Sequence, residues 1–164
     1  MFAALMHLLA LLSFAVTAGL VSLVDLKECR IPDRYLIPGT LICALALLAS
    51  AVASGSWDQF NQALQAATLS SASYLVLHLA SRGGIGFGDV KLATLIGLIV
   101  GWHSPTAALL AAGLAFAGAG FVAIGLLVVR QLSWQTPIPL APFLSLAALA
   151  ALALSVGASN YSLS

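Results

Sequence analysis

Two aspartates stand at the points where the chain changes between an apolar run and a polar loop. Asp25 ends the first apolar run, in "SLVDLKECRIPD", and Asp89 opens a later one, in "GGIGFGDVKL". Two carboxylates held a few ångströms apart cannot both ionise, so such a pair shares one proton. The ionised member can take a proton from a water that attacks a peptide carbonyl, while the protonated member donates to the developing oxyanion. These roles belong to the coupled pair, which indicates acid–base chemistry if the fold brings the two side chains together.

Each aspartate taken alone also has a structural explanation. Asp89 could cap the N-terminus of a helix, where an anion is favoured. Asp25 could be an interfacial acid paired with a basic side chain. Of the other acids, Asp58 is expected to cap a helix beside a short loop, and Glu28 and Asp33 are expected to balance three basic residues in their own loop. Ionisable residues at membrane depth are costly and usually face an interior or a wet cavity, which favours a joint role for Asp25 and Asp89.

The glycines before Asp89 do not form a phosphate-binding motif. No Gly-Lys-Ser/Thr follows at the spacing of a P-loop, and the spacing of the glycines does not match the dinucleotide fingerprint. Gly86 and Gly88 instead provide backbone freedom and close approach at a helix start. In a bilayer, irregular backbone is tolerated only where protein or a wet cavity surrounds it. We expect these glycines to fit an extended substrate strand beside Asp89, with a flexible loop as the alternative.

Composition indicates that the elements around these aspartates are membrane helices. The chain has 164 residues, of which 62% are hydrophobic and 7% are charged. A soluble domain carries about 25% charged residues. The charge-free runs are each long enough to cross a bilayer core, for which about 20 apolar residues suffice; they are residues 1–24, 35–57, 59–81, 92–129 and 131–164.

The fourth of these runs, residues 92–129, is too long for one span and is divided by the stretch "GWHSP". Proline lacks the amide donor and disfavours helix at the residue before it, so a turn is expected there. The sequence therefore predicts an all-α, polytopic bundle of six transmembrane helices. The predicted spans are 3–24, 36–54, 60–80, 89–102, 105–129 and 139–157.

The positions of the basic residues give this bundle an orientation. The loops at 25–35, 81–91 and 130–138 would lie on one side, and they contain every Lys and Arg of the chain. The positive-inside rule makes these loops cytoplasmic and both termini external. Asp25 and Asp89 then lie together at the cytoplasmic edge of the membrane.

Three stretches together resemble the type IV prepilin peptidases, which are G-x-G-D membrane aspartic proteases. Residues 86–89 form the G-x-G-D motif, which "GDVKL" continues, and "DLKECRIPD" from Asp25 is similar to the family's first motif. The stretch "IPLAPFLSLAAL" from Ile138 resembles the start of the last helix in that family, although Leu140-Ala141 stands where Phe-Gly is common. The three stretches occur in the family's order and extend over most of the chain.

The resemblance implies an aspartic endopeptidase of the bacterial inner membrane. Such enzymes remove the basic leader peptide of prepilins and pseudopilins after a glycine, on the cytoplasmic side, and Asp25 and Asp89 match their catalytic pair. Residues 1–164 contain no C-x-x-C pair. We therefore expect one transmembrane peptidase domain without the N-terminal methyltransferase or zinc-type domain of long forms, similar to the short forms of Flp/Tad pilus systems. Methyl transfer is not expected.

Three further residues are candidates for supporting roles. Lys91 lies two residues after Asp89, about 200° around a helix, so it is expected to point away and to anchor at the interface or to stabilise an acidic substrate group. Pro139 and Pro142 would leave backbone groups unpaired at the start of the last span, where these could pair with substrate backbone. A proline-marked helix start is the alternative. In addition, Gly97 and Gly101 form a G-x-x-x-G pattern that predicts close approach of another helix.

No cofactor, metal or nucleic-acid partner is expected. The two cysteines and three histidines are scattered, without the clustering of a zinc site. The expected partners are a prepilin or pseudopilin, with its basic leader and apolar N-terminal helix, and the lipid bilayer. Oligomeric state has no signature in the sequence. Two other classes remain open: a small proton-coupled transporter that uses the aspartates as a relay, and a non-catalytic subunit of a pilus or secretion machine.

Overall fold

The computed structural model describes residues 1–80, 86–104, 113 and 141–161, with side chains as far as residue 154. Every regular element in this part of the chain is a helix, which confirms the all-α prediction. The five helices overlap five of the six predicted spans, and the predicted span 105–129 lies outside the described residues apart from Gly113. The helices are α1 (Phe2–Glu28), α2 (Asp33–Ser54), α3 (Trp57–Ala80), α4 (Phe87–His103) and α6 (Ala141–Tyr161).

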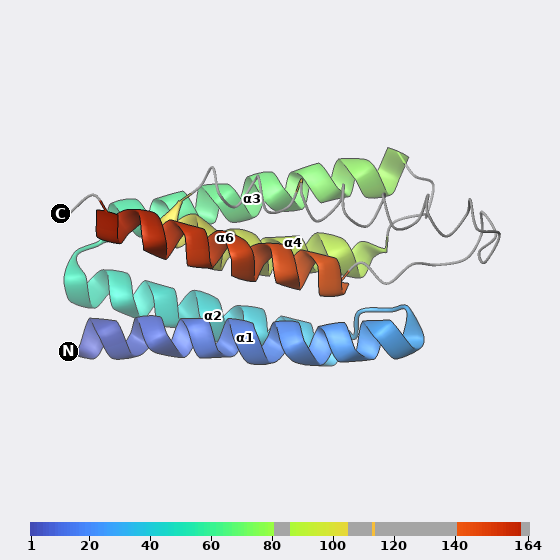
Figure 1. The fold of residues 1–164 in the computed structure, drawn as a ribbon, viewed down its shortest axis with the longest axis horizontal. Coiled ribbons are helices and arrows are strands. Elements are labelled where there is room, and N and C mark those ends of the chain that lie inside the picture. Colours follow the sequence, from blue (N-terminus) through green and yellow to red (C-terminus); the bar gives the residue numbers. More distant parts are fainter. Residues whose placement is uncertain (81–85, 105–112, 114–140, 162–164) are drawn as a thin grey trace.

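The helices lie side by side as an elongated bundle, shown in Figure 1. Short connections after α1 and after α2 make consecutive helices antiparallel. As a result, α1 ends and α2, α4 and α6 begin at one end of the bundle, which we call the aspartate end because it carries Asp25, Asp33 and Asp89. The N-terminus of α1 and the C-terminal turn of α6 lie at the opposite end (Figure 1).

The short helix α4 is the centre of the described bundle. It contacts each of the other four described helices and is buried along nearly its whole length. Its closest neighbour is α3: a Cβ added at Gly97 would lie 2.5 Å from the Cα atom of Ala67, and one added at Gly101 would meet Ala66. The predicted close approach at the G-x-x-x-G pattern is therefore confirmed, and it fixes the antiparallel register of α3 on α4.

This contact makes Gly97→Val a test of the packing. The new side chain would collide with the backbone of α3, and overpacking of this kind costs about 1–3 kcal/mol. We expect the free energy of unfolding in detergent to fall by about that amount. Gly19→Val is the matched control, because a Cβ at Gly19 meets nothing within 4 Å. Equal stability of the two variants would contradict the packing of α3 on α4.

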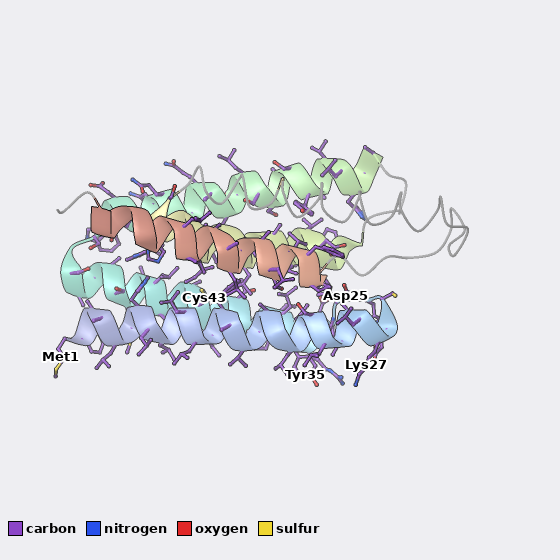
Figure 2. All side chains as sticks on the ribbon, viewed as in Figure 1. Met1, Asp25, Lys27, Tyr35 and Cys43 are labelled. Atoms are coloured by element: carbon purple, nitrogen blue, oxygen red, sulfur yellow. The ribbon has the colours of Figure 1, made fainter. Side chains whose placement is uncertain are left out.

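The outer surface of the bundle is apolar, as in a protein surrounded by lipid. Among the helices of the described residues, α1 and α2 are long and apolar enough to cross a membrane. Large apolar side chains cover their outer faces (Figure 2). Those exposed on α1 include Leu5, Leu8, Leu12, Val16 and Leu23. An exposed apolar belt of this extent is unfavourable in water and indicates a membrane protein.

Candidate active site

Asp25 lies in the last turn of α1, and its side chain faces the start of α6. The helix is capped by Cys29, which follows its last residue, adopts a left-handed conformation (φ 49°, ψ 38°) and donates its N–H to the Asp25 carbonyl at 2.8 Å. The side chain of Asp25 is turned toward α6, whereas Lys27 lies on the outer face of α1 (Figure 2). Asp25 is only 4% exposed. The turn that ends α1 therefore places this carboxylate inside the bundle.

A backbone donor from α6 holds the Asp25 carboxylate. The N–H of Ala141, the first residue of α6, donates to Oδ2 of Asp25 at 2.9 Å. The first N–H groups of a helix have no acceptor within the helix, and its dipole favours an anion there. One turn earlier in α1, the hydroxyls of Ser22 and Ser145 lie 3.0 Å apart in a hydrogen bond. Two polar contacts thus join α1 to the beginning of α6.

Asp89 is the third residue of α4 and caps that helix. Its Oδ2 accepts the N–H of Gly86 at 3.1 Å, and its own N–H donates to the Gly86 carbonyl at 3.1 Å. The capping role considered from the sequence is therefore confirmed. Asp89 is 7% exposed, so it is both a helix cap and a buried carboxylate.

The fold buries both candidate carboxylates at the same end of the bundle. Asp25 lies at the end of α1 and Asp89 at the start of α4, two segments far apart in the sequence. Each is held through its Oδ2 atom by one backbone N–H. Two carboxylates can share one proton when they lie a few ångströms apart, and a joint role of this kind for Asp25 and Asp89 remains a prediction.

Gly86 and Gly88 contact the chain itself. A Cβ at Gly88 would lie 2.6 Å from the Cβ of Ile31, and one at Gly86 would lie 3.3 Å from Oδ2 of Asp89. Gly88 therefore allows the loop after α1 to lie directly on the start of α4. The contact of these glycines with a substrate strand remains a prediction.

Lys91 forms an ion pair with Asp33, the first residue of α2, with Nζ 2.7 Å from Oδ2. The sequence led us to expect that Asp33 would balance the basic residues of its own loop. The partner is instead on α4, because the loop after α1 crosses the start of that helix. Among the proline candidates, Pro142 is the second residue of α6, directly after the amide that binds Asp25, and Pro139 lies outside the described residues.

Tyr74 is a site residue that the sequence reasoning did not single out. It lies on α3 and is 1% exposed. The register set by Gly97 opposite Ala67 places Tyr74 level with the start of α4, where Asp89 lies. One signal in the sequence could have identified it: Ala63, Ala67, Ser70 and Tyr74 recur at helical spacing, which places Tyr74 on the face of α3 that is buried.

We expect Tyr74→Phe to lower the rate of peptide cleavage about fivefold while leaving the fold intact. The substitution keeps the buried ring and removes a hydroxyl dipole near Asp89, an interaction worth about 1 kcal/mol. The rate constant for cleavage under substrate saturation is the quantity to measure. Tyr35→Phe is the control, because Tyr35 lies under the guanidinium of Arg34 on the α2 surface. Equal rates for the two variants would remove Tyr74 from the site.

The fold and the site define a helical membrane protein with two buried aspartates at one end of the bundle. Comparison with protein families gives the same class a name: residues 9–154 match the type IV leader peptidase family. The chain belongs to this family, whose members are proteases.

Relatives of known function agree with this assignment. The leader peptidase HopD of Escherichia coli is 32% identical over 146 residues, which are 84% of this chain and 87% of that protein. The prepilin leader peptidase/N-methyltransferase of Aeromonas hydrophila is 32% identical over 138 residues, 77% of this chain but 43% of that protein. The prepilin leader peptidase/N-methyltransferase of Pseudomonas aeruginosa is 28% identical over 134 residues, which are 80% of this chain and 45% of that protein. The chain thus spans less than half of these longer relatives. No solved structure matches it significantly.

Proposed function

We propose that this protein is an aspartic endopeptidase that removes the leader peptide of prepilins or pseudopilins, with Asp25 and Asp89 as its catalytic pair. The observation that carries the proposal is the burial of two carboxylates, from helices distant in the sequence, at one end of an apolar bundle. Membership of the leader peptidase family gives the reaction class.

In the proposed mechanism the pair holds one proton between its two carboxylates. The ionised carboxylate takes a proton from a water, whose oxygen then forms a bond to the scissile carbonyl carbon. The protonated carboxylate gives its proton to the carbonyl oxygen, which produces a neutral gem-diol. In the collapse of the gem-diol, one hydroxyl gives its proton to the ionised carboxylate as the carbonyl re-forms. The C–N bond breaks at the same time, and the departing nitrogen receives the proton that the pair took from water. The pair returns to its starting state with one proton.

The two backbone donors have distinct parts in this scheme. The N–H of Ala141 orients Asp25, and the N–H of Gly86 orients Asp89, each at Oδ2. In this scheme the Oδ1 atoms are the ones that exchange protons with the water and the peptide. Gly86, Gly88 and the start of α6 with Pro139 and Pro142 form the proposed seat for the substrate backbone.

We further propose that the protein crosses the bacterial inner membrane six times, with both termini external and the aspartate end cytoplasmic. The described Lys and Arg side chains all lie at the aspartate end: Lys27, Arg30, Arg34 and Lys91. This supports a cytoplasmic location for that end under the positive-inside rule. A prepilin would present its basic leader on this side and leave its apolar helix in the bilayer. A single peptidase domain without methyl transfer remains part of the proposal.

Processing of a co-expressed prepilin tests this function. We expect the protein to convert the prepilin to a faster-migrating form on a gel, with a mass that corresponds to cleavage after the glycine. The same protein in liposomes should show no proton flux in the absence of substrate. Unprocessed prepilin together with proton flux would support the transporter reading, and unprocessed prepilin without flux would support a non-catalytic subunit.

A further inference from the structure

We propose that Asp33 and Lys91 are positioning residues for the aspartate pair: their ion pair fixes the rotation of α4 relative to the turn that carries Asp25. The proposal rests on the proposed peptidase function and extends it to two residues outside the pair. It follows from two contacts between the loop after α1 and the first turn of α4.

The first contact is the ion pair itself. Lys91 Nζ donates to both carboxylate oxygens of Asp33, at 2.8 Å and 2.7 Å. Asp33 begins α2 and is joined to Asp25 through only the last turn of α1 and a short loop. Lys91 is two residues from Asp89 on the same helix. The ion pair is therefore a direct connection between the two segments that carry the aspartates.

The second contact is the apposition of Ile31 and Gly88. A Cβ at Gly88 would come within 2.6 Å of the Ile31 Cβ, so no side chain fits between the loop and α4 there. Residues 88 and 91 are three apart and share one face of the helix, while Asp89 points to another face. Two contacts one turn apart on a single face determine how far α4 is rotated about its axis. That rotation determines where the Asp89 carboxylate points.

An aromatic ring limits the freedom of the Lys91 ammonium on another side. Nζ lies 5.2 Å from the centroid of the Phe87 ring, within the range of a cation–π contact. Phe87 is itself packed edge-to-face on His78 at the end of α3, with ring centroids 5.7 Å apart. The lysine is thus held between a carboxylate of α2 and a ring of α4.

Stabilisation of the fold does not account for this arrangement. The Lys91 and Asp33 side chains are 32% and 55% exposed, and ion pairs with such exposure contribute little to stability. Placement of a catalytic group is far more sensitive, since a misplacement of about 1 Å can lower a rate about 100-fold. The alternative role of Lys91, binding an acidic group of the substrate, requires the ammonium to leave Asp33. The positioning role predicts that loss of Lys91 lowers kcat, whereas substrate binding predicts that it raises KM.

A double-mutant cycle on the full-length protein in liposomes, with a prepilin substrate, tests the proposal. We expect Lys91→Met and Asp33→Asn each to lower kcat about tenfold with KM changed less than about twofold, because the pair aligns the chemistry without binding substrate. The double variant should also lose about tenfold, since the second substitution removes nothing further. Lys91→Arg and Asp33→Glu keep the ion pair and should stay within about threefold of the wild type. Lys27→Met and Asp58→Asn are the matched controls and should leave kcat unchanged.

Three results would overturn the positioning role while leaving the peptidase intact: single variants with the wild-type kcat, a double variant that loses about 100-fold, or a Lys91→Met variant whose KM alone rises. The wild-type reaction in the same experiment tests the proposed function separately. If the wild-type protein leaves the prepilin uncut, the peptidase proposal fails first and the positioning role fails with it.

Discussion

Leader removal is expected to stop when either aspartate is replaced by asparagine. Asn keeps the size of the side chain and an oxygen that can accept the same backbone N–H, from Ala141 at position 25 and from Gly86 at position 89. It cannot take a proton from water or give one to the oxyanion. General acid–base catalysis contributes about 10²–10⁴-fold for each group. We therefore expect Asp25→Asn and Asp89→Asn each to lower the rate by at least about 10³-fold.

The same change at Asp58 is the matched control for this result. Asp58 lies in the first turn of α3, at the end of the bundle opposite to the pair. Asp58→Asn should process prepilin at the wild-type rate. Membrane extraction and thermal unfolding should show that all three variants are inserted and folded. Loss of activity in the Asp58 variant, or loss of the folded protein in the others, would mean that the assay reports stability.

The second large effect on activity is expected when the backbone N–H of Ala141 is removed. Ala141→Pro removes the N–H that donates to Asp25, and proline is well tolerated in the first turn of a helix, where the N–H has no helical partner. A hydrogen bond to a charged group is worth about 1.5–3 kcal/mol. We expect kcat/KM to fall about 10- to 100-fold, because Asp25 would lose the donor that orients it.

Because Ala141 is fully buried, the proline ring adds volume that needs its own control. Ala141→Val adds a similar volume and keeps the N–H donor. If the valine variant loses as much activity as the proline variant, crowding at the start of α6 explains the loss, and the hydrogen bond to Asp25 does not. If the proline variant alone loses activity, the amide of Ala141 has a direct part in holding the pair.

Sequence reasoning predicted the helical class and the two aspartates because both depend on local patterns. Charge-free runs indicate membrane helices, and a carboxylate at the end of such a run is unusual enough to be noticed. The close approach at Gly97 was predicted for the same reason, since small residues four apart mark a helix contact. In each case the signal lies within one continuous stretch of the sequence.

The contacts between distant residues were not predictable in this way. Asp33 had three basic residues within its own loop, and only the path of the loop over α4 makes Lys91 its partner. Ala141 acts through its backbone N–H, which leaves no trace in the residue type. For Gly88, the sequence indicated close approach but not its partner, and the structure places Ile31 there. These assignments need the register between helices, which residue types alone do not fix.

Cleavage of a purified prepilin in a single turnover, by the reconstituted wild type and by each of the two Asn variants, examines the aspartate pair itself. With enzyme in excess, the wild type should convert the prepilin completely to the shortened form. Asp25→Asn and Asp89→Asn should each bind the prepilin and leave its leader in place. Cleavage by either variant at a rate near that of the wild type would show that the two carboxylates do not act as a pair.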